Sequence, residues 1–144
     1  MFSPANLRHG IAAALLVLAV AACGGTATGP TTAPGASMTA LPLEVDVEKA
    51  AAMRDAGAFM LDVRQPEEWA AGHIPDATLI PLGELADRVA EVPTGREIVV
   101  VCRSGNRSQQ GRDILINAGY GTVTSMIGGM NDWAAAGKPV ETGQ

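Results

Sequence analysis

Hydrophobic and polar stretches alternate from about residue 41 to the end of the chain. Short apolar runs predict strands, and longer segments closed by glycine predict helices. The clearest strand is Glu97-Ile98-Val99-Val100-Val101. The other predicted strands span residues 43–45, 59–63, 77–80 and 122–126, and the predicted helices span residues 47–55, 66–71, 83–90, 107–118 and 130–136. Strands that alternate with helices predict an α/β domain with a mainly parallel central sheet and helices on both faces.

A hydrophobic run of another kind lies near the N-terminus. Residues 11–22 carry no charge and follow Arg8 and His9, which is typical of a secretory signal peptide. The run is shorter than the roughly 20 residues of a transmembrane helix. Val20-Ala21-Ala22-Cys23 resembles the lipobox of bacterial lipoproteins. This resemblance implies cleavage before Cys23 and a lipid on that residue; a plain signal peptide is the alternative.

The segment after Cys23 is uncharged and rich in Gly, Pro, Ser and Thr. Such a composition predicts a flexible tether, because it buries too little apolar surface to offset its ordering entropy. We therefore expect a lipoprotein signal peptide at residues 1–22, a lipid-anchored linker at 23–40 and a folded domain at 41–144. This organisation predicts an extracytoplasmic protein of the cell envelope, anchored to a bacterial membrane.

Charge and composition exclude several classes of function. The net charge is −5 and no basic stripe is present, so nucleic acid is not an expected partner. The chain has two histidines and no Cys-x-x-Cys pair, and its methionines are scattered. We therefore expect no metal site and no cofactor. A monomer is the default expectation.

Cys102 is the strongest candidate for a catalytic residue. It directly follows the clearest strand, where α/β sheets bind ligands. The loop after it, Arg103-Ser104-Gly105-Asn106, contains residues that tolerate positive φ, so its backbone N–H groups can form an anion-binding nest at the start of a helix. Arg103 and Arg107 add positive charge. These surroundings favour a thiolate and predict a nucleophile rather than a buried apolar cysteine.

Four motifs of the chain resemble those of single-domain rhodaneses, over residues 41–141. The resemblance implies a rhodanese-like α/β fold and transfer of a sulfane sulfur through a persulfide on Cys102. The motifs are Leu61-Asp62-Val63-Arg64, then Glu67-Glu68-Trp69 with Gly72-His73-Ile74-Pro75-Asp76-Ala77, then Val101-Cys102-Arg103-Ser104-Gly105-Asn106-Arg107-Ser108, and finally Gly128-Gly129-Met130 with Trp133.

The expected reaction begins with attack of the Cys102 thiolate on a small anionic donor such as thiosulfate, and ends with transfer of the sulfur to a thiol or cyanide. Arg103 and Arg107 are candidates for holding the donor. Alternatively, one or both support the loop by pairing with Asp62, Glu67 or Glu68. Because a lipid is expected on Cys23, Cys102 is expected to be the only free thiol, so the acceptor must come from outside.

Other residues have expected supporting roles. Asp62 braces the loop or caps a turn, and Arg64 pairs with Glu67 or Glu68 or lies in a solvated turn. His73 is expected to be structural. Trp69 and Trp133 are expected to be core anchors.

Two other functions compete with sulfur transfer. A cysteine-dependent phosphatase, or an arsenate reductase with the same cradle, needs Cys-x5-Arg, and Ser108 stands where that arginine would fall. Because Arg107 lies one residue before that position, the loop is one residue shorter than a phosphatase loop, and it suits a single sulfur atom better than a phosphate. The second alternative is a sulfur carrier or binding module for a partner protein, without efficient turnover.

Overall fold

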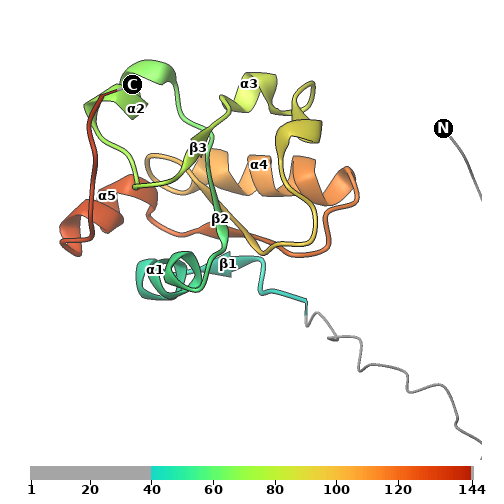
Figure 1. Cartoon of the computed structure of the whole chain (residues 1–144), viewed down its shortest axis with the longest axis horizontal. Helices are drawn as coiled ribbons and strands as arrows, with labels where there is room; N and C mark the ends of the chain where they lie inside the picture. Colours follow the sequence, from blue (N-terminus) through green and yellow to red (C-terminus); the bar gives the residue numbers. More distant parts are fainter. Residues whose placement is uncertain (1–39, 144) are drawn as a thin grey trace, which may run out of the picture. The chain divides into compact units, whose positions relative to one another are not determined.

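The structure, a computed structural model, describes residues 40–143 (Figure 1). The predicted signal peptide, Cys23 and the predicted linker up to residue 39 lie outside the described residues. Their assignments therefore stay predictions. Within residues 40–143, no helix combines the length and the apolar character that crossing a bilayer requires.

The centre of the domain is a sheet of five parallel strands in the order β1-β5-β4-β2-β3. The long pairing is between β2 and β4, with Phe59 opposite Ile98 and Asp62 opposite Val101. The carboxyl ends of these two strands therefore lie side by side, and the segments that follow them share one edge of the sheet. The strands are β1 (Glu44–Val45), β2 (Phe59–Asp62), β3 (Thr78–Leu79), β4 (Ile98–Val101) and β5 (Val123–Met126).

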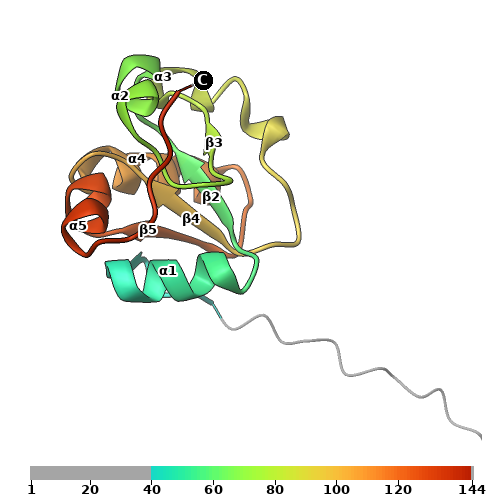
Figure 2. The same cartoon turned by 60° about the vertical axis from the view of Figure 1, so that its left-hand side comes forward.

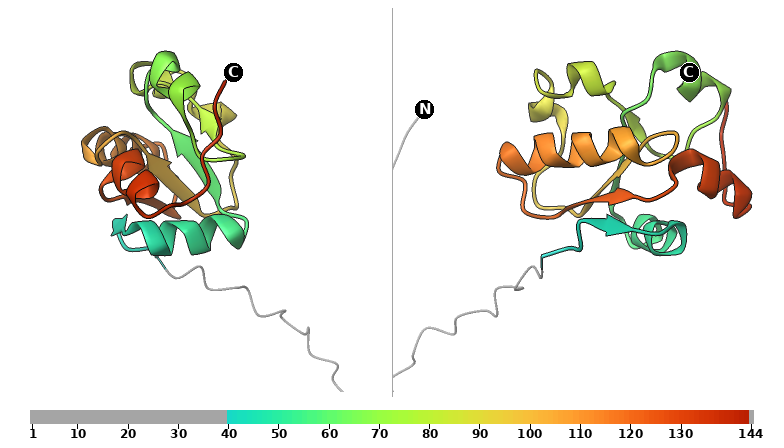
Figure 3. Two further views of the ribbon diagram at one scale, coloured as in Figure 1. Left: turned by 90° about the vertical axis from the view of Figure 1, so that its left-hand side faces the viewer. Right: turned by 180° about the vertical axis from the view of Figure 1, so that it is seen from behind.

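Helices cover both faces of the sheet, which confirms the predicted fold class. Alternate residues of β4 face opposite ways: Val99 and Val101 pack with α1 (Val47–Asp55) and α5 (Gly129–Ala135). Ile98 and Val100 pack with α3 (Leu82–Leu85) and α4 (Asn106–Asn117). The rear view in Figure 3 shows α4 on one side of β5 and α1 on the other. Because both faces of β4 are buried, its sequence is continuously apolar instead of alternating.

The prediction of a single helix over residues 83–90 is wrong. Helix α3 ends at Leu85, and a separate 3-10 turn, η1, spans Val89–Glu91. The Tyr120 hydroxyl lies 2.8 Å from the carbonyl oxygens of both Val89 and Val92. The Val89 carbonyl also accepts the backbone N–H of Val92 at 3.1 Å, so η1 is held by one local hydrogen bond and by the tertiary contact with Tyr120, which no local pattern reveals.

Helix α2 (Pro66–Ala71) has no buried residue. Trp69 is half-buried and stacks on His73 with 3.7 Å between ring centroids, so its assignment as a core anchor is wrong. Trp133, in contrast, is fully buried, as predicted. The C-terminal segment runs past α2 (Figure 2), and Glu141 exchanges two backbone hydrogen bonds of 2.8 Å with His73. His73 thus has a structural role, as expected.

Candidate active site

Cys102 directly follows β4 at the carboxyl edge of the sheet. It is 1% exposed and belongs to the core cluster beneath α4. Since β2 pairs with β4 along its whole length, Asp62 ends at the same edge as Val101. The sheet therefore brings together two regions that are about forty residues apart in the sequence, and these regions contain most of the predicted site residues.

The loop after Cys102 directs a backbone donor at its sulfur. Gly105 adopts a φ of +102°, a left-handed conformation that glycine accepts without steric cost. Its N–H donates a hydrogen bond of 3.1 Å to the Cys102 Sγ. Ser104 and Asn106 are exposed on either side. The sulfur thus lies at the start of α4, where free N–H groups and the positive end of the helix dipole favour negative charge.

Two carbonyl groups of the loop are bound by α5, those of Cys102 and Arg103. Met130 N–H donates to the Cys102 carbonyl at 2.8 Å, and Asn131 N–H donates to the Arg103 carbonyl at 3.0 Å. Gly129, with a φ of +59°, makes this approach possible: a Cβ at that position would overlap the Cys102 carbonyl oxygen and the Arg103 backbone. The motif Gly128-Gly129-Met130, although distant in sequence, therefore packs against the loop after Cys102 and holds its backbone.

Ser108 is a site residue whose role the sequence patterns do not reveal. It is fully buried in the first turn of α4. Its Oγ lies 3.7 Å from the Cys102 Sγ and donates a hydrogen bond of 2.6 Å to the Gly105 carbonyl. The spacing of three residues between Gly105 and Ser108 indicates this contact, because a serine in the first turn of a helix can donate to the carbonyl of the residue before the helix.

Arg107 supports the loop by pairing with Glu68. Its two terminal nitrogens donate to the two carboxylate oxygens at 2.7 and 2.8 Å, in a bidentate pair that joins α4 to α2. These hydrogen bonds hold the pKa of Glu68 at about 2, although partial burial opposes the effect. The same contact raises the pKa of Arg107. The sequence leaves Asp62, Glu67 and Glu68 as possible partners of Arg107, and in the structure the partner is Glu68.

Asp62 and Arg64 form a second, buried pair beside the first. The Arg64 Nη2 donates to an Asp62 oxygen at 2.7 Å, and the Arg64 backbone N–H donates to the other oxygen at 2.9 Å. Asp62 therefore caps a turn, one of its two predicted roles. Arg64 also donates to the backbone carbonyls of Glu68 and Gly72, at 3.1 and 2.8 Å. Both predictions for Arg64 are wrong. Its ion pair is with Asp62 and not with Glu67 or Glu68, and at 5% exposed it is buried and not solvated.

Arg103 remains the available cation of the site. It is exposed, and within residues 40–143 its guanidinium makes no ion pair with another side chain. The structure thus gives the two loop arginines different environments: Arg107 is committed to Glu68, whereas Arg103 faces solvent next to Cys102.

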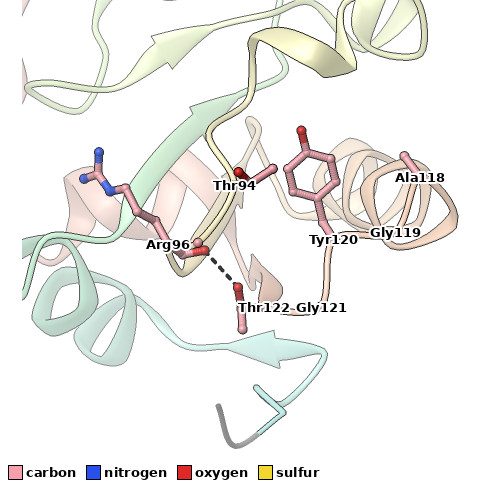
Figure 4. A pocket seen from close by; sticks show the side chains of 8 residues that line it. Thr94, Arg96, Ala118, Gly119, Tyr120, Gly121 and Thr122 are labelled. Atoms are coloured by element: carbon pink, nitrogen blue, oxygen red, sulfur yellow. Dashed lines mark hydrogen bonds between the residues drawn. The ribbon is translucent and has the colours of Figure 1, made fainter. Parts of the chain in front are cut away.

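Two hollows lie at the opposite, amino edge of the sheet. One, of about 320 Å³, is lined by residues such as Tyr120 and Thr122 (Figure 4). There the Thr122 hydroxyl donates to the Arg96 carbonyl at 2.8 Å. The other, of about 510 Å³, includes Arg54 and Arg96, whose side chains donate to backbone carbonyls. These side chains of Arg54, Arg96 and Thr122 bond within the protein, and both hollows lie at the edge opposite Cys102.

Comparisons with known proteins agree with this geometry. A family model described as a rhodanese-like domain matches residues 46–136. A sulfurtransferase of Allochromatium vinosum is 42% identical over 82 residues, 57% of this chain and 77% of that protein. The thiosulfate sulfurtransferase GlpE of Pseudomonas syringae is 37% identical over 97 residues, 67% of this chain and 91% of that protein. The crystal structure of a rhodanese-related protein from Thermoplasma volcanium has a TM-score of 0.65 and 27% identity, and covers 69% of this chain and 98% of that one.

We predict that Gly129→Ala destabilises the protein more than Gly137→Ala. Both glycines have φ near +60°, at +59° and +67°. Alanine at either position costs about 1–2 kcal/mol of backbone strain. Only at Gly129 does the new Cβ also overlap the Cys102 loop, which adds about 1–3 kcal/mol. The free energy of unfolding in urea measures the difference, and equal losses in the two variants would refute the proposed close packing.

Proposed function

The chain belongs to the rhodanese-like family, a family of sulfurtransferases and sulfur carriers, and we propose that it transfers a sulfane sulfur as a persulfide on Cys102. The observation that carries the proposal is the hydrogen bond of 3.1 Å from Gly105 N–H to the Cys102 Sγ. A backbone donor fixed on a cysteine sulfur at a helix start stabilises a thiolate, and the thiolate is the reactive form of cysteine.

In the first half-reaction, the Cys102 thiolate attacks the outer sulfur of a donor such as thiosulfate. The Sγ–S bond forms as the S–S bond of the donor breaks, and sulfite leaves with the electron pair of that bond. The outer sulfur of the new persulfide carries the negative charge. We expect this charge to be stabilised by the N–H groups at the start of α4.

In the second half-reaction, an acceptor thiolate or cyanide attacks the outer sulfur and the Cys102 thiolate leaves. The chain has only Cys23 and Cys102, and Cys102 is free in the structure. With a lipid on Cys23, as proposed below, the acceptor is a separate molecule. Because Cys102 is 1% exposed, the acceptor must be slender enough to reach the end of the loop.

We assign recognition of the anionic donor to Arg103. Its guanidinium is exposed beside Cys102, whereas Arg107 is held by Glu68. An arginine fork matches the oxygens of an oxyanion such as thiosulfate. Arg107 then maintains the shape of the loop by joining α4 to α2.

The environment of Arg107 also opposes a phosphatase or arsenate reductase. In those enzymes an arginine at the end of the loop binds the oxyanion, and Ser108 stands at that position here. Arg107, one residue earlier, forms a bidentate pair with Glu68. A phosphate would therefore have to compete with a carboxylate that is already bound.

We predict that thiosulfate adds one sulfur atom to Cys102. Exposure of the purified chain, followed by mass spectrometry, should show an adduct of one sulfur atom on the peptide that contains Cys102. Cyanide should remove this adduct, because it attacks the outer sulfur. Cys102→Ser should carry no adduct, since a hydroxyl is a poor nucleophile without a general base.

Turnover separates an enzyme from a sulfur carrier. If the wild type gains the adduct but releases thiocyanate no faster than Cys102→Ser, the protein is a carrier and the enzymatic proposal is wrong. If no adduct forms at all, both alternatives fail.

We predict that Arg103→Ala raises the KM for thiosulfate about fivefold, as expected for the loss of one exposed charge contact. The kcat should change less, because Arg103 does not touch the Cys102 sulfur. Added salt should raise the KM of the wild type more than that of the variant, since salt screens exposed charges. Arg96→Ala is the matched control, because Arg96 is exposed near the amino end of β4. An equal effect of the two variants would contradict the assignment of Arg103.

We further propose that Cys23 carries a lipid that anchors the domain outside the cytoplasm. The support is the uncharged run at residues 11–22 followed by Val20-Ala21-Ala22-Cys23. We predict that a clickable fatty-acid label enters the full chain in a bacterial host, and that Cys23→Ser abolishes the label and releases the protein from the membrane fraction. Cys102→Ser, which changes the other cysteine, should keep the label. Labelling of Cys23→Ser would overturn the proposal.

A further inference from the structure

Ser108 and Cys102 form a closed chain of hydrogen bonds with Gly105. Gly105 N–H donates to the Cys102 Sγ at 3.1 Å, the Cys102 thiol donates to the Ser108 Oγ at 3.7 Å, and the Ser108 hydroxyl donates to the Gly105 carbonyl at 2.6 Å. Cys102 and Ser108 are 1% and 0% exposed. No bulk solvent is therefore present to replace a lost contact.

We propose that Ser108 is a positioning residue that turns its hydroxyl hydrogen from the Gly105 carbonyl to the Cys102 sulfur when the thiol loses its proton. The inference rests on the proposed function, in which Cys102 reacts as a thiolate. It assigns to Ser108 a contact that exists only in the ionised state of the site.

The reversal follows from the number of protons. A serine hydroxyl has one hydrogen and can accept through its lone pairs. While Cys102 is a thiol, its hydrogen points to Ser108, and the hydroxyl hydrogen is free to point to Gly105. After ionisation the sulfur can only accept, and an oxygen lone pair facing a thiolate in a buried site is unfavourable. Rotation about the Cβ–Oγ bond removes this repulsion and adds a donor to the thiolate.

The Gly105 carbonyl can lose the Ser108 hydroxyl without becoming an unsatisfied buried acceptor. Gln109 N–H also donates to this oxygen, at 3.3 Å, as part of the first turn of α4. The usual cost of breaking a buried hydrogen bond, an unpaired group, is therefore largely avoided. The carbonyl has two donors in the thiol state and keeps one in the thiolate state.

This switch matches the steps of sulfur transfer. The inner sulfur is a thiolate before it attacks the donor and again when it leaves the persulfide. In the persulfide the charge lies on the outer sulfur, so Ser108 can return to the Gly105 carbonyl. Ser108 therefore stabilises the Cys102 thiolate twice in the cycle: before the thiolate attacks the donor, and when it leaves the persulfide.

The remaining charged groups around Cys102 are bound in fixed pairs or are exposed. Arg107 of α4 is paired with Glu68 of α2, and Asp62 and Arg64 after β2 are paired with each other. The exposed groups are Arg103 of the loop and Asp132 of α5. A change at Ser108 leaves these charges in place, so its effect on the protonation of Cys102 can be measured separately from theirs.

The test is the pH dependence of Cys102 alkylation by iodoacetamide in the full chain with Cys23→Ser, which leaves a single thiol. We expect Ser108→Ala to move the midpoint upward by about one pH unit, as expected for one lost hydrogen bond to a charged group. Ser108→Thr, which keeps the hydroxyl, should restore the midpoint. Ser125→Ala is the matched control, because Ser125 is also fully buried and its hydroxyl donates to Leu43 instead.

A midpoint that Ser108→Ala leaves unchanged, or that Ser125→Ala moves equally, overturns the inference. If Ser108→Ala does not fold, the wild type provides the test: the carbon chemical shift of the Ser108 Cβ should titrate at the alkylation midpoint, and a constant shift overturns the inference. These readouts need no sulfur donor. Failure to form the persulfide would overturn the proposed function alone, whereas an unmoved midpoint with normal persulfide formation would overturn only the role of Ser108.

Discussion

The orientation of the peptide groups around Cys102 depends on two hydrogen bonds from α5. The N–H groups of Met130 and Asn131 bind the carbonyls of Cys102 and Arg103. With the carbonyls held elsewhere, the left-handed turn at Gly105 can present its N–H to the Cys102 Sγ. A negatively charged sulfur is stable only where donors, and not carbonyl oxygens, surround it. The chemistry of the site therefore rests on how closely α5 approaches the loop.

Two ion pairs connect α2 with the start of α4 and with the end of β2. Arg107 binds Glu68, and Arg64 binds Asp62 together with the backbone carbonyl of Glu68. Glu68 thus connects both pairs, through its side chain to α4 and through its carbonyl to the end of β2. Helix α2 has no buried residue of its own, so these polar contacts contribute much of what keeps it beside the loop. Most of the charge near Cys102 therefore maintains geometry, whereas Arg103 and Asp132 are exposed.

Local sequence patterns predicted the helices and strands well where the pattern itself is local, such as an apolar run or a glycine at a helix end. The run Ile98–Val101 is continuously apolar because it is the central strand and both of its faces are buried. Glycines follow most of the predicted helices because they end them. The patterns failed where a distant group intervenes. The predicted helix over 83–90 is divided into α3 and η1, and Tyr120 binds the carbonyls of Val89 and Val92 in and after η1. Trp69 stacks on His73 instead of entering the core.

By itself, the sequence determined that Cys102 follows the central strand of an α/β sheet in a loop of residues suited to binding an anion. These features are local, because they depend on the order of residue types along a few turns of chain. Only the tertiary structure decided what each loop residue does. Arg107 is assigned to Glu68 and Ser108 to the Cys102 sulfur, while Gly129 approaches the loop from a distant helix. A side chain's role depends on which groups lie next to it in the folded chain, and sequence spacing does not contain that information.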